Sequence, residues 1–150
     1  MKKLLSVYQS ANSIDVALLI VRVGIAALML THGWPKLEML FSADPVQFPA
    51  LFGLSAAGTL ALAVFAEVFC SLLILVGLGT RLAAIPLIVT MLVAVFLVHG
   101  ADPFAKQELG LLYLLPYVML LLTGSGRYSL DYMLQQKAVK STKARRLSVQ

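Results

Sequence analysis

The chain contains very little cysteine and very little charge. Its 150 residues include one cysteine, Cys70, and only 13% are Asp, Glu, Lys or Arg. One thiol excludes an intrachain disulfide and a C-x-x-C pair, so redox chemistry would need a cofactor or a partner. The sequence also lacks the Walker, G-x-G-x-x-G, H-E-x-x-H and G-x-S-x-G patterns of common nucleotide-binding, zinc-protease and hydrolase sites. By contrast, 60% of the residues are hydrophobic, which is typical of a polytopic membrane protein.

The positive charge is concentrated near the C-terminus. The five basic residues there equal the whole net charge of +5, and they are Lys137, Lys140, Lys143, Arg145 and Arg146. Such a run is typical of a solvated tail at an anionic membrane face, and we expect no nucleic-acid partner. We therefore divide the chain into a transmembrane domain, residues 1–134, and a basic cytoplasmic tail, residues 135–150.

Long apolar runs predict an all-α membrane protein, a four-transmembrane-helix up-down bundle. The expected spans are residues 16–33, 56–78, 82–98 and 109–123. Pro35 is expected to end or bend the first span. Residues 37–55 are interrupted by proline and glycine but rich in phenylalanine. They predict a periplasmic segment that either folds over the bundle or is anchored among lipid headgroups. Residues 127–134 predict a short C-terminal interfacial helix.

The distribution of basic residues predicts the orientation of the bundle. With four spans, Lys2, Lys3, Arg81, Arg127 and the basic tail all fall on one side. The few basic residues on the other side are outnumbered there by acidic ones. Because positive residues are enriched in cytoplasmic segments, both termini are expected in the cytoplasm.

Glu67 is the single charge in the apolar run 56–78. A carboxylate at that depth costs at least a few kcal/mol on insertion scales, so it needs a partner, a cavity or a proton. A structural ion pair, or a neutral acid hydrogen-bonded between helices, would explain it without a function. Arg22 lies in the first span at an overlapping depth, and we predict that the two side chains pair.

A second polar set lies towards the predicted periplasmic face: His32, Lys36, His99 and Glu108. These side chains could hold a quinone head group, relay protons or bind a metal such as zinc or copper. The metal interpretation has the least support, because two histidines on different helices show no ligand spacing, and we predict no metal site. Each residue could also simply cap a helix or extend to the interface.

The order of these residues resembles the DoxX family of small four-helix membrane proteins. The resemblance covers roughly residues 17–131 and rests on the set taken together: Arg22 and Gly24; His32, Gly33 and Lys36; Glu67, Gly77, Gly79, Thr80 and Arg81; His99 and Gly100; Glu108 and Tyr113; and Gly124 to Asp131. It implies a four-helix bundle in the bacterial cytoplasmic membrane. Some relatives resemble subunits of quinone-linked thiosulfate oxidoreductases, and others accompany redox defence or metal-related operons.

These observations lead to one functional hypothesis and two alternatives. The hypothesis is an integral membrane subunit of a quinone-linked redox system, with a polar site on the periplasmic half. The candidate catalytic residues are Glu67, His32 and Lys36, and the candidate cofactor-binding residues are His32, Lys36, His99, Glu108, Tyr113 and Arg22. The alternatives are a small-molecule channel or carrier and a non-catalytic assembly subunit. Expected partners are membrane lipid and a redox partner subunit, and the sequence leaves open a homo-oligomer.

Overall fold

A computed structural model describes residues 11–42 and 44–147 of the chain. Every regular element in that part is helical. In chain order the elements are α2 (Ala11–Phe41), α3 (Ala56–Val64), the π-helix η1 (Phe65–Cys70), α4 (Ser71–Val76), α5 (Thr80–Val93), the π-helix η2 (Ala94–Val98), α6 (Phe104–Thr123) and α7 (Leu130–Leu147).

Four continuous helical segments in the described residues are long and apolar enough to cross a membrane. They are Asn12–Phe41, Ala56–Val76, Thr80–Val98 and Phe104–Thr123. The second and third each consist of α-helix and π-helix running on without a break. The predicted all-α bundle of four spans is thus confirmed.

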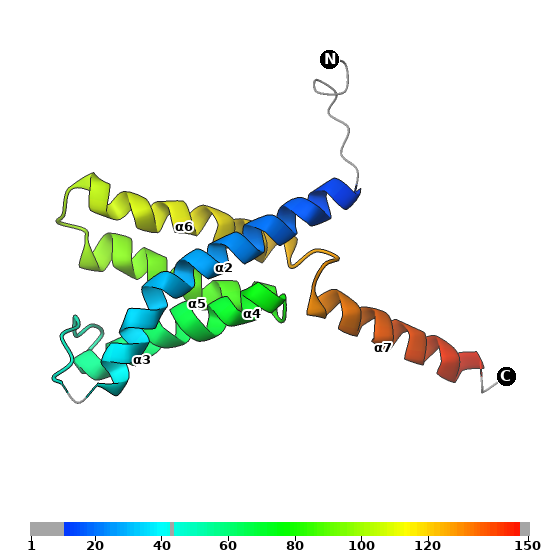
Figure 1. Ribbon diagram of the computed structural model, residues 1–150, viewed down its shortest axis with the longest axis horizontal. Coiled ribbons are helices and arrows are strands. Elements are labelled where there is room, and N and C mark those ends of the chain that lie inside the picture. Colours follow the sequence, from blue (N-terminus) through cyan, green and yellow to red (C-terminus); the bar gives the residue numbers. More distant parts are fainter. Residues whose placement is uncertain (1–10, 43, 148–150) are drawn as a thin grey trace, which may run out of the picture.

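The four spans pack around one apolar core (Figure 1). α2 lies across the other helices and contacts α3, η1, α4 and α6, while α5 packs against both α4 and α6. The residues at the centre of the bundle are fully buried, and they include Ala26, Ile74, Leu87, Tyr117 and Leu120. The outward faces carry many exposed large apolar side chains, as expected for helices in contact with lipid.

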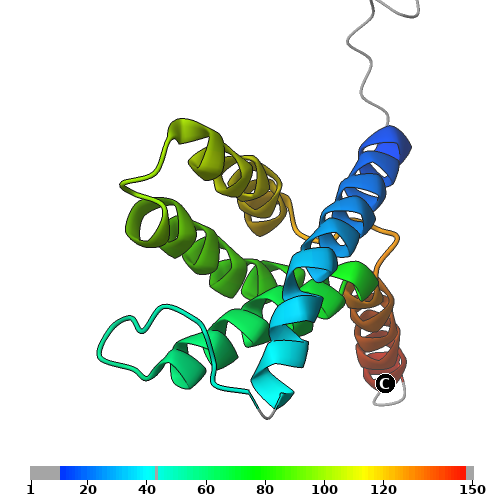
Figure 2. The same cartoon turned by 60° about the vertical axis from the view of Figure 1, so that its left-hand side comes forward.

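The start of α2, the α4–α5 turn and α7 lie at one end of the bundle, and the other two connections lie at the opposite end (Figure 1). The α4–α5 turn is short because Gly77 and Gly79 both adopt left-handed backbone, with φ of 72° and 58°, which glycine tolerates without steric cost. Figure 2 shows residues 44–55 forming an arch between α2 and α3. Both ends of the described chain therefore lie on one side, and its cytoplasmic assignment stays a prediction.

Three helices are longer than the sequence predicted, because α6 begins at Phe104 instead of residue 109 and both α2 and α7 continue past their expected ends. Pro35 does not end the first span, because α2 continues to Phe41 with Pro35 inside it. A proline removes only one backbone donor, and a single lost bond is tolerated where the helix packs on neighbours. At the other terminus, α7 extends to Leu147 instead of stopping near residue 134. Residues 135–147 contain no glycine or proline, so nothing in them interrupts a helix.

Candidate functional site

The buried carboxylate Glu67 forms an ion pair with Lys36. The ammonium of Lys36 donates a hydrogen bond to Glu67 Oε1. The two side chains differ in exposure, since Glu67 is 2% exposed and Lys36 is 30% exposed. Glu67 Oε2 is buried and has no hydrogen-bond partner. The pair thus offers one carboxylate oxygen and the remaining ammonium protons for other contacts.

The predicted pair between Arg22 and Glu67 is wrong. Arg22 is buried at the opposite end of the bundle, where its guanidinium donates to the carbonyls of Ser125 at 2.8 Å and Tyr128 at 2.6 Å. Gly33 packs against Glu67, and Arg22 lies about three helical turns, roughly 16 Å, further along α2. The helices are adjacent as expected, but their register separates the two charges.

Close helix contact brings Lys36 to Glu67. A Cβ atom on Gly33 would lie 2.8 Å from Val68 Cγ2 and 3.1 Å from the Glu67 backbone. Glycine at this point therefore lets α2 approach η1, and Lys36 follows one turn later on the same helix. Glu67 itself lies within the π-helix η1, and wide π-helical turns are frequent at functional sites.

A cavity of about 130 Å³ adjoins this ion pair; its lining is both polar and apolar, and we name it the polar cavity for its titratable side chains. Its lining comes from α2, η1, α5, η2 and α6, and the polar and titratable members are His32, Lys36, Glu67, His99, Lys106 and Tyr113. The His32 ring meets the Tyr113 ring edge-on, with centroids 5.7 Å apart. Five of the seven predicted site residues thus surround one cavity, and Tyr113 orients one of them.

Two of the predicted site residues lie elsewhere. Glu108 is exposed and does not line the cavity, because it points away from Gly110 and Tyr113 on α6. Arg22 connects α2 to the α6–α7 segment. Neither Glu108 nor Arg22 has its side chain at the cavity. Their positions do not show whether either residue has a functional role.

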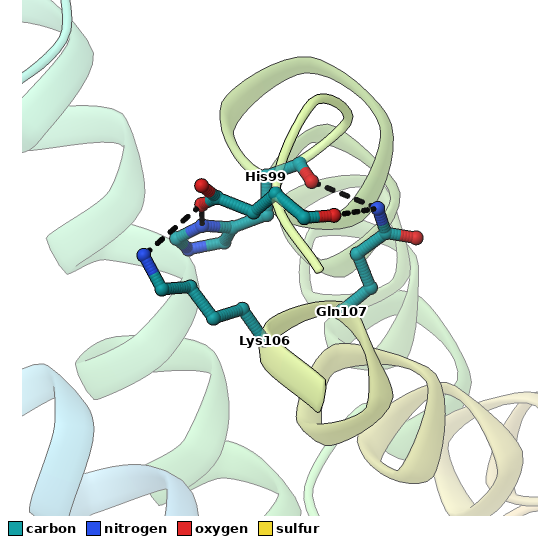
Figure 3. Close-up of polar contacts among 4 residues, drawn as sticks. His99, Lys106 and Gln107 are labelled. Carbon is teal, nitrogen blue, oxygen red and sulfur yellow. Dashed lines mark hydrogen bonds and ion pairs between the residues drawn. The ribbon is translucent and has the colours of Figure 1, made fainter. Parts of the chain in front are cut away.

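His99 belongs to a small polar network at the edge of the cavity (Figure 3). Its Nδ1 lies 2.8 Å from the carboxylate of Asp102, which also pairs with Lys106 at 3.5 Å. The Gln107 side chain donates to the backbone carbonyls of His99 and Asp102. The hydrogen bond from His99 lowers the pKa of Asp102, and the charge of Lys106 acts in the same direction. This network fixes the His99 ring beside the cavity.

The sequence alone did not identify several residues of the cavity wall. Met29, Met91 and Gly110 line it, and a Cβ on Gly110 would lie 2.6 Å from Val95 Cγ2. Lys106 was visible only as a loop charge. The helical spacing of Met29, His32 and Lys36 along one face of α2 is the signal that could have suggested Met29.

An apolar slot of about 300 Å³ also adjoins the ion pair. It is bounded by the 44–55 loop, α3, α5 and η2, and it shares Lys36, Glu67, Ala94 and His99 with the polar cavity. Phe48 lines the slot, and its ring centroid is 5.9 Å from the Lys36 ammonium. The ion pair therefore stands at the junction of a polar and an apolar space.

The described residues do not gather into a metal centre. Within residues 11–42 and 44–147, no group of three or more His, Cys, Asp or Glu is placed to hold a metal ion. His32, His99 and Glu67 line one cavity, but the His99 ring is already bonded to Asp102.

Comparisons with known proteins agree with this architecture. The sequence profile of the DoxX family matches residues 17–100. The chain is 31% identical over 135 residues to the uncharacterized membrane protein Rv3486 of Mycobacterium tuberculosis, covering 79% of this chain and 81% of that protein. No solved structure matches the chain. The protein is a multi-pass membrane protein that belongs to the DoxX family.

Proposed function

We propose that the protein is the membrane subunit of a quinone-linked redox system and that the polar cavity binds the quinone head group. The observation that carries the proposal is the position of the Lys36–Glu67 pair, between a polar cavity and an apolar slot. A quinone combines a polar ring with a long apolar tail, so its binding site needs both kinds of space. The two spaces, about 130 and 300 Å³, together reach the range of small-molecule sites, roughly 300–1,000 Å³.

The cavity residues fit the chemistry of a quinone ring. The Lys36 ammonium and the His32 imidazole supply donors for the two ring carbonyl oxygens. Glu67 Oε2 is buried without a partner, so it is placed to hold or accept a proton beside the ring. A bound quinone supplies two-electron, two-proton redox chemistry that these side chains lack. The lone thiol, Cys70, is buried, so the proposal requires a partner subunit that exchanges electrons with the quinone.

One feature of the core argues against the channel or carrier alternative. Ala26, Ile74 and Leu120 are all 0% exposed, and along their helices they lie between the Glu67 region and Arg22. An ion or polar solute crossing this apolar layer would lose its hydration without gaining polar partners. The polar groups on the two sides of the layer thus do not form a continuous path in this conformation.

Trp34, the only tryptophan in the chain, provides a direct test. It lies on α2 between His32 and Lys36, so a quinone in the cavity should quench its fluorescence. We expect saturable quenching when a soluble quinone is added to the protein in lipid nanodiscs. His32→Phe, which keeps the ring contact with Tyr113, should weaken binding at least fivefold. So should the paired change Lys36→Gln with Glu67→Gln, which removes both charges together.

The matched control is Lys137→Gln on α7, which makes the same chemical change as Lys36→Gln at the far end of the molecule. It should bind like the wild type. Quenching that rises linearly without saturation, or that is the same in all variants, would contradict the proposal. A structural or assembly role would then be the remaining interpretation.

A further inference from the structure

We infer that the apolar slot is the exit path for the isoprenoid tail of the quinone, so that the site takes tail-bearing quinones directly from the lipid. This inference rests on the proposed function, because it concerns the same bound molecule. It adds the route by which a tail-bearing quinone enters, from the lipid and not from water, and it assigns the slot residues as determinants of which quinones are admitted.

The burial of its lining residues indicates that the slot is a groove open to lipid. Its floor on α3 consists of the small buried residues Thr59 and Ala63, whereas Leu62 and Val89 on its rim are exposed large apolar side chains. Because these rim residues belong to spans that face hydrocarbon, the slot opens sideways into the bilayer and not into water. An apolar chain leaving the bundle at this point therefore stays in an apolar environment.

The 44–55 loop forms the roof of the slot. Phe48, Leu51 and Phe52 all line it, and the Leu51 amide donates to the Thr59 hydroxyl at 3.2 Å, which ties the loop to the floor. Phe52 has a φ of 56°, a left-handed conformation that is unfavourable for residues other than glycine. Its phenyl ring lines the slot and is largely exposed on the outer side.

Continuity with the polar cavity identifies the occupant. Lys36, Glu67, Ala94 and His99 line both spaces, so a molecule can extend from one to the other past the ion pair. A phospholipid would place its charged headgroup at the water interface, with no use for donors at the inner end of an apolar groove. A molecule with a small polar ring and a branched apolar chain uses both ends.

The slot is expected to determine which quinones can enter the site, and not how tightly they bind. Lipid chains are as apolar as the slot lining, so moving a tail from the bilayer into the slot yields little hydrophobic free energy. The wild type should therefore bind tail-bearing and tail-less quinones with similar affinity, once their concentrations in the bilayer are taken into account. Closing the slot should exclude only those quinones that carry a tail.

The experiment fills the slot from two walls separately. Ala63→Leu adds bulk to the floor and Val93→Phe adds bulk from α5, while Ala27→Leu adds the same bulk at an exposed position on α2 outside the cavity and the slot. Binding of a tail-less quinone and of the same ring with a several-unit isoprenoid tail is measured by Trp34 quenching in nanodiscs. Both slot variants should lose the tailed quinone at least tenfold and keep the tail-less one within threefold, and Ala27→Leu should keep both.

Each other outcome has a distinct meaning. If both quinones bind the filled variants equally, the slot is not the tail path, and the head-group site stands without it. If neither quinone binds the wild type, the proposed function fails and the inference fails with it. If native mass spectrometry finds a phospholipid that is lost on filling while both quinones still bind, the occupant is an acyl chain and the inference is overturned. Because the two variants alter different helices, misfolding of one leaves the test intact.

Discussion

Lys36 and Glu67 form an ion pair whose two members have very different access to solvent. The ammonium of Lys36 is bonded to Glu67 Oε1, but the lysine side chain is 30% exposed and the glutamate is 2% exposed. Lysine can turn towards the interface on its long stem if its partner is lost. Glutamate at its position in η1 has no such alternative. Loss of Lys36 and loss of Glu67 should therefore lower the stability of the bundle by different amounts.

This asymmetry predicts unequal costs for the two single substitutions. Lys36→Met leaves a buried carboxylate without its partner and should lower the free energy of unfolding by about 3–5 kcal/mol. Glu67→Leu leaves a lysine that can reach the interface, so it should cost less, about 1–3 kcal/mol. Unfolding of both variants in mixed micelles would measure the difference.

The double variant Lys36→Met with Glu67→Leu is the control for this prediction. It removes both charges, so it should be more stable than Lys36→Met alone despite carrying an additional change. Equal costs for the two single variants, or simple additivity in the double variant, would show that the pair does not stabilise the bundle as described.

The sequence was sufficient to predict the fold because the bilayer imposes strong rules. Uninterrupted apolar runs of helical length have few structural options in lipid, so hydropathy predicted four spans and gave the bounds of the second and third to within two residues. The C-terminal ends of α2 and α7 could not be predicted from hydropathy. Pro35 is a weaker helix breaker inside a packed bundle than in water, and the polar residues after position 134 gave no apolar pattern to follow.

The site was only partly predictable, for a geometric reason. The sequence showed that Glu67 needs a partner, but the choice between Arg22 and Lys36 depends on how α2 slides along η1. Gly33 sets that register by its contact with Glu67 and Val68, and a contact between helices is not visible in one sequence. The apolar slot was invisible for the same reason, since its walls come from four separate segments.

Gly33 should therefore be sensitive to the smallest substitution. In Gly33→Ala the new Cβ would meet Val68 Cγ2 at 2.8 Å, and such overpacking typically costs about 1–3 kcal/mol. Gly24→Ala, on the same helix with nothing within 4 Å, should be neutral or stabilising by up to about 1 kcal/mol. Thermal unfolding in nanodiscs compares the two, and equal behaviour would refute close packing at Gly33.

The orientation of the bundle predicts which engineered thiols are accessible from outside the cell. Ser42 lies at the end opposite to Gln135, and both are exposed, while the native Cys70 is buried and gives little background. Charge asymmetry predicts a periplasmic position for Ser42. A membrane-impermeant maleimide should label Ser42→Cys in intact cells and Gln135→Cys only after lysis. The reverse pattern would overturn the orientation and leave the fold intact.

The Asp102 network predicts a local dependence on pH. His99 lowers the pKa of Asp102, so the folded state favours the ionised carboxylate. That contribution is present above the ordinary Asp pKa of about 3.9 and is lost as the pH falls through the lowered value. A carboxyl NMR titration should give a higher midpoint for Asp102 in His99→Ala than in the wild type. The Gln107 contact to the backbone of residue 99 should survive that change, so an unaltered midpoint would exclude His99 as the cause.

Arg22 is expected to hold the first span, α2, against the segment that follows α6. Its guanidinium donates to the carbonyls of Ser125 and Tyr128 from two different nitrogens, whereas lysine is shorter and carries a single nitrogen, which lacks this fork geometry. Arg22→Lys should therefore lose at least one bond, and Arg22→Met both, at about 1.5–3 kcal/mol for each bond from a charged donor. Because the lost contacts hold residues 124–129, limited proteolysis there should become faster in the order wild type, Arg22→Lys, Arg22→Met. Quinone binding at the far end of the bundle should change little, and a loss of binding without faster cleavage would mean that Arg22 belongs to the site after all.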